Sequence, residues 1–498
     1  MGEDRLISNA LNAGDLWRDI VAATADLDPD VTAVRIALLT HLQNQQKTTQ
    51  QMRDMLLAAG EFLCMSGSKP VETMRSGALF CFAHPTPSNM SNLIPVAREA
   101  LRRGLLGGIV MGGDFRAELR EFIGVVPVAL AQDLVGGLTT TVRIKNATRL
   151  GKVYQQLSSA LIRRRPSLAP VLAANRGAIV RQLACSIQFG SALGQLLDRW
   201  SPSCVISTSD FWPLEHQLCR QASQRKIPSI LIQHGAIGDF WWPFVADMYC
   251  MWGETHVQQM QELGAPLERM VAAGMPATDS MFRGTEDGSR RRPSDRSRPI
   301  CLLISHTHGR AIEKDIFDKY RHFVSETIQL APEINWMVKL HPMENDELYR
   351  EMGSSVFDRL TFYPKTASLQ DAVTDADVVT TVYSTAGLES MVLGRPLIIA
   401  PAIARVRHLA PWPSMGGGMY ANTPADFQFQ LNRLISDQDY REQQLRKQER
   451  FLAKSFANQG HAAERIVDWL AEYSAPRAVP VVPQRCSSQT PAYSAASQ

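Results

Sequence analysis

Residues able to bind a phosphate group cluster at one junction, in the segment ADVVTTVYSTAGLESMVLGRPLI (376–398). Its apolar run predicts a buried strand that ends at Ser384, and a helix follows. Ser384, Thr385 and Gly387 are small, and a helix start offers free backbone amides and partial positive charge, which attract phosphate. Glu389 follows one turn later, where its carboxylate can accept hydrogen bonds from ribose hydroxyls. An ordinary helix cap is the alternative interpretation.

A histidine follows another predicted strand, in VKLHPMEN (338–345). Pro342 stops the strand, so we expect His341 at the rim of the sheet. An imidazole there can donate a hydrogen bond to a departing phosphate, or protonate it. Lys339 adds positive charge. The alternative is a capped histidine on the surface.

Two more histidines, His306 and His308, lie in SHTHGR (305–310), after a further predicted strand. Residues two apart share one face of a strand, but no third ligand is evident nearby, so the pattern does not indicate a metal site. A donor-binding loop and a polar, solvated turn both fit this segment.

The first half of the chain has its own polar strand end, in SILIQHGAIGDFWWPF (229–244). Gln233, His234 and Gly235 end a strand, and Gly235 lets the backbone approach a ligand closely. Asp239 is a carboxylate in the same loop. These residues are candidates for the side of a cleft that receives an acceptor.

Short apolar runs alternate with amphipathic helices on both sides of a charged stretch, which predicts an α/β protein with two parallel sheets. The expected organisation is a helical N-terminal extension, a Rossmann-like acceptor domain, a linker, a Rossmann-like donor domain and a disordered tail. Their ranges are 1–70, 71–283, 284–298, 299–474 and 475–498.

Composition narrows the function further. The chain has 498 residues, 45% hydrophobic and 20% charged, with a formal net charge of +3, which gives no reason to expect nucleic-acid binding. It has no apolar run long enough to span a membrane, and its first residues are polar, unlike a signal peptide. The eight cysteines form no CxxC pair and are interpreted as reduced core residues of a cytoplasmic protein.

Together these segments resemble bacterial surface and capsular polysaccharide glycosyltransferases of the GT-B fold, the His-Pro-motif group. That group includes capsule Kdo transferases, sialyltransferases and CDP-glycerol glycerophosphotransferases. The resemblance covers residues 77 to about 470 and rests on four pieces in order: LIQHG (231–235), AAGMPATD (272–279), KLHP (339–342) and STAGLE (384–389). One departure is Ala277, where these families often carry arginine.

The resemblance implies roles for these residues. His341, within the His-Pro pair, would contact the donor phosphate and assist nucleotide departure. Ser384 and Thr385 would hold the same phosphate, and Glu389 would lie near the ribose. The segment 233–235 would line the acceptor side or the hinge.

An inverting mechanism is favoured because retaining GT-B enzymes commonly carry a glutamate eight positions before Glu389, where this chain has Thr381. Inversion by direct displacement needs a base on the acceptor and stabilisation of the leaving phosphate. The candidate bases are Asp114, Asp210 and Asp239, each of which also fits a turn or cap, and Asp239 is preferred.

The predicted reaction moves a sugar from a CMP-, UDP- or CDP-linked donor onto a glycan or lipid-linked glycan, with no cofactor or metal. Two alternatives stay open: a non-hydrolysing nucleotide-sugar 2-epimerase, and a non-catalytic scaffold that binds a nucleotide or a partner. The N-terminal helices could bind that partner. A lipid-linked acceptor would bring the protein to the inner face of the cytoplasmic membrane, through Arg163, Arg164 and Arg165.

Overall fold

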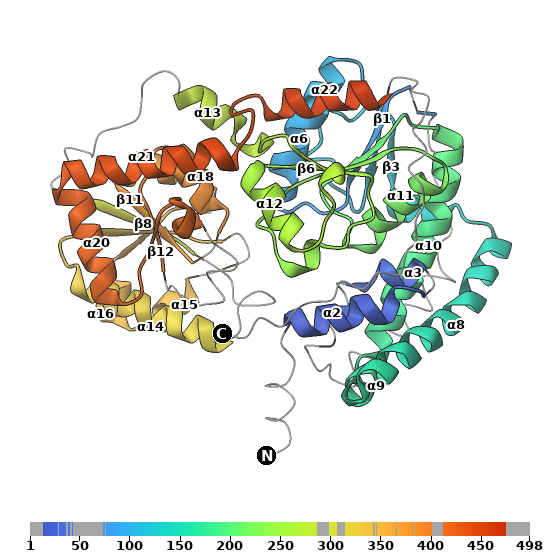
Figure 1. Ribbon diagram of the computed structural model, residues 1–498, viewed down its shortest axis with the longest axis horizontal. Coiled ribbons are helices and arrows are strands. Elements are labelled where there is room, and N and C mark those ends of the chain that lie inside the picture. Colours follow the sequence, from blue (N-terminus) through green and yellow to red (C-terminus); the bar gives the residue numbers. More distant parts are fainter. Residues whose placement is uncertain are drawn as a thin grey trace.

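Two parallel β-sheets, one in each half of the chain, organise the computed structural model (Figure 1). The predicted tail, 475–498, lies outside the described residues, as do 286–297 of the predicted linker and 43–70 of the predicted N-terminal extension. The structure describes residues 13–27, 29–35, 38–39, 42, 73–74, 76–285, 298–305, 314–341, 344, 346–364, 366–382, 384–400 and 412–474.

The first sheet is built from the short apolar runs of the N-terminal half. In chain order its strands are β1 (Ala78–Phe82), β2 (Leu106–Met111), β3 (Val128–Leu130), β4 (Val205–Ser207), β5 (Ser229–Ile232), β6 (Met248–Met251) and β7 (Met270–Ala272). Across the sheet the order is β3-β2-β1-β4-β5-β6-β7, with every neighbouring pair parallel. Most of these residues are buried, as expected for a parallel sheet covered on both faces.

The second sheet repeats this plan in the C-terminal half. Its strands are β8 (Ile300–Ile304), β9 (Asn335–Lys339), β10 (Leu360–Phe362), β11 (Val378–Thr381), β12 (Leu397–Ile399) and β13 (Met419–Tyr420). They are arranged β10-β9-β8-β11-β12-β13, again with all neighbours parallel. The strand order therefore reverses between β1 and β4 in one sheet and between β8 and β11 in the other. Open α/β sheets bind ligands beside the carboxyl ends of the strands at such a reversal.

Helices connect the strands of both sheets. Those around the first sheet are α6 (Pro87–Arg102), α7 (Ala131–Gly136), α11 (Pro213–Gln224), α12 (Glu254–Glu262) and α13 (Asp279–Thr285). Those around the second are α14 (Lys314–Leu330), α15 (Glu347–Arg350), α16 (Ser354–Phe357), α17 (Leu369–Asp375), α18 (Ala386–Val392), α20 (Pro424–Ser436) and α21 (Gln438–Ser455).

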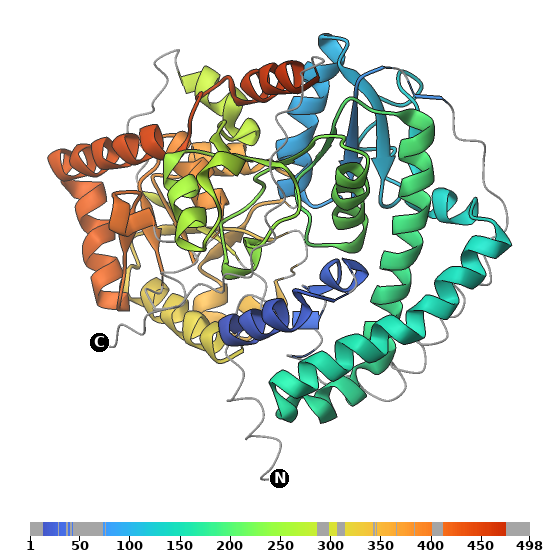
Figure 2. The same ribbon diagram turned by 45° about the vertical axis from the view of Figure 1, so that its right-hand side comes forward.

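A helical layer lies beside the first sheet (Figures 1 and 2). It combines the N-terminal helices α2 (Ala13–Thr24) and α3 (Pro29–Thr32) with α8 (Thr140–Arg164), α9 (Ala169–Ala174) and α10 (Arg176–Trp200). Apolar residues of α2 and α3 share one core with α8 to α10. The buried carboxylate of Asp30 pairs with Arg149 at 2.8 Å and Arg220 at 2.9 Å. The described part of the N-terminal extension is thus packed against its own chain.

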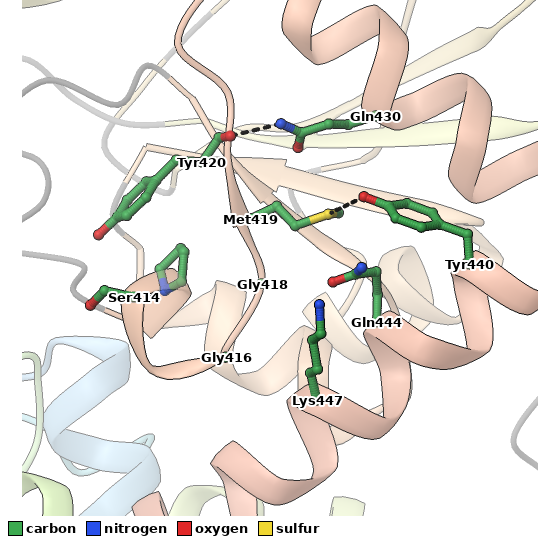
Figure 3. A pocket seen from close by; sticks show the side chains of 10 residues that line it. Ser414, Gly416, Gly418, Met419, Tyr420, Gln430, Tyr440, Gln444 and Lys447 are labelled. Carbon is green, nitrogen blue, oxygen red and sulfur yellow. Dashed lines mark hydrogen bonds between the residues drawn. The ribbon is translucent and has the colours of Figure 1, made fainter.

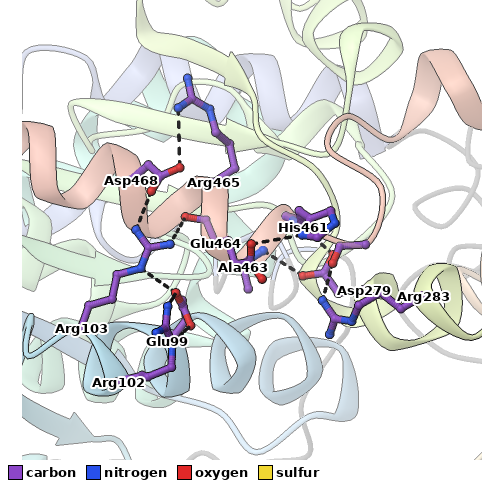
Figure 4. Close-up of polar contacts among 12 residues, drawn as sticks. Glu99, Arg102, Arg103, Asp279, Arg283, His461, Ala463, Glu464, Arg465 and Asp468 are labelled. Carbon is purple, nitrogen blue, oxygen red and sulfur yellow. Dashed lines mark hydrogen bonds and ion pairs between the residues drawn. The ribbon is translucent and has the colours of Figure 1, made fainter.

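The last helix, α22 (Ala462–Ser474), packs on the first unit (Figures 1 and 4). The carboxylate of Asp279 accepts hydrogen bonds from the backbone N–H groups of Ala462 and Ala463, both at 2.9 Å. The predicted C-terminal domain, 299–474, therefore includes a helix that belongs to the core of the N-terminal unit, a return that strand and helix patterns do not reveal. Its buried side chains in that core are Ala463, Ile466, Val467 and Leu470.

Gly274, in the AAGMPATD segment, lies against the residues that lead from α21 into α22. Its φ of 104° is one that residues with a side chain rarely adopt. A Cβ at this position would also overlap the carbonyl oxygen of Ala457. Glycine is therefore required here by the close approach of the two units.

Candidate functional site

The end of β9 holds His341 beside the end of β8. The backbone N–H of His341 donates to Ser305 Oγ at 2.9 Å, and Ser305 Oγ donates to the carboxylate of Glu344. The backbone N–H of Ser305 donates to the Lys339 carbonyl at 3.1 Å. The His341 side chain is half-buried, and this burial lowers its pKa from the usual value. His341 thus lies at the carboxyl edge of the second sheet, as predicted.

Lys339 is held toward the edge of the sheet. Its Nζ donates to the carbonyl oxygen of Pro364, after β10, at 3.1 Å. Partial burial lowers the pKa of this ammonium group. Pro342, His306 and His308 lie outside the described residues, so their predicted roles stay predictions.

The predicted phosphate-binding junction follows β11, across β8 from His341. Ser384 Oγ accepts from the backbone N–H of Ala386 at 3.3 Å, and the Ser384 carbonyl accepts from Gly387 N–H at 2.8 Å. Ser384 and Thr385 are half-buried. Gly387 lets the helix approach the sheet, because a Cβ would lie 3.1 Å from Leu397 Cδ2. The helix that follows, α18, has seven residues.

Glu389 lies on the same short helix. The residue keeps partial exposure, while burial of its carboxyl raises its pKa to about 7. Neighbouring strands lie about 4.8 Å apart, so the ends of β9 and β11, on either side of β8, are separated by roughly 10 Å. His341 and Ser384 therefore follow strands on either side of β8, at the same edge of the sheet.

At the first sheet, Gln233 and His234, which were predicted to line a cleft, form hydrogen bonds to backbone groups within the fold. Gln233 is fully buried. Its Oε1 accepts from the Trp252 backbone at 2.8 Å and its Nε2 donates to the Gly235 carbonyl at 2.9 Å. His234 Nδ1 pairs with the Thr208 carbonyl at 2.7 Å, and burial lowers its pKa to about 4. Its ring stacks on Trp241 with centroids 5.1 Å apart.

The three candidate bases differ in their surroundings. Asp210 is buried, and its Oδ2 accepts the backbone N–H groups of Val245 and Ala246, so this carboxylate holds a loop. Burial raises its pKa to about 6. Asp114 is exposed and pairs with Arg116 at 3.1 Å. Asp239 begins a short 3-10 helix (Asp239–Trp241), and its side chain lies outside the described part of the structure.

A pair that the sequence pattern did not predict lies where the strand order of the first sheet reverses. His84 follows β1, and Glu215 lies in the first turn of α11, which follows β4. His84 Nε2 is 3.7 Å from Glu215 Oε2. Both atoms are buried and have no hydrogen-bond partner among the described residues, whereas Glu215 Oε1 accepts from Ser209 Oγ at 3.0 Å.

One signal in the sequence points to His84. The chain contains two His-Pro pairs, His84-Pro85 and His341-Pro342, and each follows a predicted strand. Only the second was interpreted as functional. Glu215 has no such signal, because it lies within an amphipathic helix and meets His84 only through the tertiary fold.

A cavity of about 680 Å³ lies elsewhere, between β13 and α21 (Figure 3). Glycines precede β13, and side chains of α21 close the other side. None of the predicted site residues lines it. Its lining is Pro413, Ser414, Gly416, Gly418, Met419, Tyr420, Gln430, Tyr440, Gln444 and Lys447.

The predicted basic patch is partly occupied. Arg164 and Arg165 both pair with Asp19 of α2, at 3.0 Å and 2.7 Å, whereas Arg163 is exposed. Among the described helices, none is long and apolar enough to cross a membrane. Within the same described ranges, no three His, Cys, Asp or Glu side chains gather as metal ligands would.

Comparisons with known proteins support the architecture. No family model matches the sequence, and a search of curated proteins finds no match. Among solved structures, Staphylococcus aureus MnaA with UDP aligns with a TM-score of 0.51 at 13% identity, over 80% of this chain and 97% of the other. The Neisseria meningitidis UDP-GlcNAc 2-epimerase bound to UDP-GlcNAc gives 0.51 at 12% identity, over 80% and 99%. The predicted two-domain α/β fold of GT-B type is thereby confirmed.

Proposed function

We propose that this chain is an inverting glycosyltransferase that transfers a sugar from a nucleotide donor to a hydroxyl of a glycan acceptor. The proposal rests on the side chains that lie at the two places where the strand order reverses, one in each sheet. One has hydroxyl and imidazole groups around β8, and the other has a His-Glu pair between β1 and β4. A displacement at an anomeric carbon needs both kinds of group, one for the leaving phosphate and one for the acceptor proton.

The second sheet fits the nucleotide. Ser384 and Thr385 offer hydroxyls, and His341 offers an imidazole from the other side of β8. Glu389, with its pKa near 7, can accept hydrogen bonds from ribose hydroxyls once it is ionised. A uridine nucleotide is the first donor to test, because the two aligned structures contain UDP and UDP-GlcNAc.

The first sheet fits an acceptor, because a transfer to a hydroxyl removes one proton. Three carboxylates of the first sheet are described well enough to compare as groups that could help to remove this proton: Asp210, Asp114 and Glu215. Asp210 holds the loop at Val245, and Asp114 is solvent-exposed beside Arg116. The His84-Glu215 pair keeps two buried atoms, Nε2 and Oε2, that have no hydrogen-bond partner among the described residues.

A nucleotide-sugar 2-epimerase is the second candidate, and it is favoured by the alignment with the Neisseria protein, which is a UDP-GlcNAc 2-epimerase. Epimerisation at C2 must remove a proton from carbon and return one to the opposite face. That chemistry calls for more than one acid-base group beside the sugar. Transfer needs one such group, and the His84-Glu215 pair supplies it.

A thermal-shift series with CMP, CDP, UDP and GDP tests the donor site. A ligand at 100 times its Kd stabilises the native state by about 2.7 kcal/mol, which raises the melting temperature measurably. The matched variant Ser384→Ala with Thr385→Ala should lose this shift. An unchanged melting temperature with all four nucleotides would contradict the proposed donor site.

Incubation with the best-binding nucleotide sugar in D2O separates the candidates. Nucleotide release that requires an added glycan supports transfer. Deuterium incorporation at C2 without any acceptor indicates epimerisation. Binding without either reaction indicates a non-catalytic scaffold.

A further inference from the structure

We propose that His84 and Glu215 form a proton-sharing pair in which His84 accepts the proton of the acceptor hydroxyl and Glu215 positions the ring. The catalytic role of His84 rests on the proposed function, since it needs an acceptor. The pairing itself is a property of the folded chain and can be measured without substrate.

His84 and Glu215 face each other through two buried polar atoms, neither of which has a hydrogen-bond partner among the described residues. Glu215 is 1% exposed, and a buried carboxyl oxygen without a hydrogen-bond partner is unfavourable, more so when it is charged. Its Oε2 has no hydrogen bond to any described residue, and His84 Nε2, at 3.7 Å, is equally buried and unpartnered there. A hydrogen bond between them would satisfy both atoms at once, and we expect the imidazole to rotate toward Oε2 to form it.

The Glu215 carboxyl is oriented by contacts other than the one with His84. Glu215 Oε1 accepts from Ser209 Oγ at 3.0 Å, which turns Oε2 toward His84. Pro213 begins α11 and places Glu215 in the first turn, where the helix dipole favours negative charge. Glu215 is therefore fixed from two sides, as expected of a group that positions another.

The imidazole faces outward on its other side. Its side chain is 38% exposed although Nε2 is buried, and it meets Trp212 edge-on with centroids 5.5 Å apart. Nε2 faces Glu215, which leaves Nδ1 on the other side of the ring. Nδ1 is thus the ring nitrogen that a substrate hydroxyl can reach.

Burial sets the protonation of the pair. It raises the pKa of Glu215 to about 8, with a smaller contribution from Asp210, and it lowers the pKa of His84. Below about pH 8, and above the lowered pKa of His84, each of the two groups carries one proton. Above about pH 8 only the imidazole does, and its Nε2–H is then donated to the Glu215 carboxylate while Nδ1 is free. The other titratable groups that face the pair are Cys81, Cys219 and His234, all kept neutral near pH 7 by burial.

The acceptor O–H bond breaks and its proton moves to His84 Nδ1, while the oxygen electron pair forms the new bond to the anomeric carbon. The bond from that carbon to the donor phosphate breaks, and its electron pair leaves with the nucleotide. The imidazolium that results is stabilised by the Glu215 carboxylate through Nε2–H.

The pairing is tested by NMR of the full-length protein labelled with ¹⁵N-histidine, without substrate. We expect the His84 ring signals to report the ionisation of Glu215, with a midpoint near pH 8, and this midpoint to be lost in Glu215→Gln. The matched control is Glu326→Gln, which disrupts the exposed pair of His322 and Glu326 at 2.9 Å and should leave His84 unchanged. A His84 signal that titrates alone, at one pH in both wild type and Glu215→Gln, overturns the proposal.

Turnover supplies the second readout. The kcat should rise with pH through about 8 in the wild type and be low and flat in Glu215→Gln, with KM changed less than about twofold. A variant with wild-type kcat and an unchanged pH profile would overturn the positioning role. If the transferase assay fails while the paired titration is seen, the proposed function is wrong and the pair stands.

A gentler variant covers the case in which Glu215→Gln does not fold. Ser209→Ala removes a hydrogen bond that favours the charged carboxylate, so the midpoint of the pair should move to higher pH. An unchanged midpoint in a folded Ser209→Ala protein would contradict the proposed geometry.

Discussion

The two sheets have the same strand order up to the sixth strand, yet their carboxyl edges offer different environments. At the first, Asp210 and Glu215 are buried, and their pKa values rise to about 6 and about 8. At the second, His341, Ser384 and Thr385 are half-buried. Topology decides where a site can form, and local burial decides its chemistry. A desolvated edge suits proton transfer, and a polar, partly hydrated edge suits a nucleotide.

Replacing each of the two His-Pro histidines with asparagine, one at a time, tests whether the two sheet edges have different roles. His84→Asn should lower kcat by about 10² to 10⁴-fold, because proton transfer in the transition state is lost. Its nucleotide affinity should stay within about twofold of the wild type. His341→Asn should weaken nucleotide binding about tenfold, the effect of one hydrogen bond to a charged group. Calorimetric titration and initial rates measure both.

The two variants must differ for the comparison to hold. If His84→Asn weakens the nucleotide as much as His341→Asn does, the division of labour between the sheets is wrong. The exposed His461, which pairs with Glu464 at 3.1 Å, provides the control, and His461→Asn should change neither quantity.

A second contrast is the helical layer that lies beside the first sheet. Asp30→Ala leaves Arg220 without its buried partner and should lower the free energy of unfolding by about 3 kcal/mol. Nucleotide affinity should be unchanged, because the partners of Asp30, Arg149 and Arg220, lie in helices beside the first sheet and the proposed donor site lies at the second. Denaturant unfolding measures the loss. Asp346→Ala, which removes a surface pair with Arg350, should cost less than about 1 kcal/mol. Equal losses would mean that Asp30 is not an anchor of the layer.

Much of the fold follows from the sequence because parallel strands covered on both faces are short apolar runs. The run at 78–85 contains β1, and that at 377–384 contains β11. Strands as short as β3 and β13, of three and two residues, give no periodic signal of their own. The placement of α22 also escaped prediction, since amphipathic periodicity does not say which of two cores a helix joins.

The site was predicted unevenly for a physical reason. His341 and Ser384 follow strands directly, so their place at the sheet edge is set by local sequence. Asp210 and Gln233 also follow strands, but distant backbone groups bind their side chains, and sequence spacing cannot show that. The pair of His84 and Glu215 spans more than a hundred residues and exists only after β1 and β4 become neighbours.

A smaller effect is expected in the pH dependence of nucleotide binding, which should differ from the pH dependence of turnover. Because burial raises the pKa of Glu389 to about 7, its carboxylate forms as pH rises through 7, and only the ionised group accepts two ribose hydroxyls. Nucleotide affinity should therefore increase by up to about tenfold between pH 6 and pH 8, and Glu389→Gln should remove this dependence. The midpoint for binding should lie below the midpoint near pH 8 expected for turnover. A single shared midpoint, kept in Glu389→Gln, would mean that one group governs both steps and that the two edges do not titrate separately.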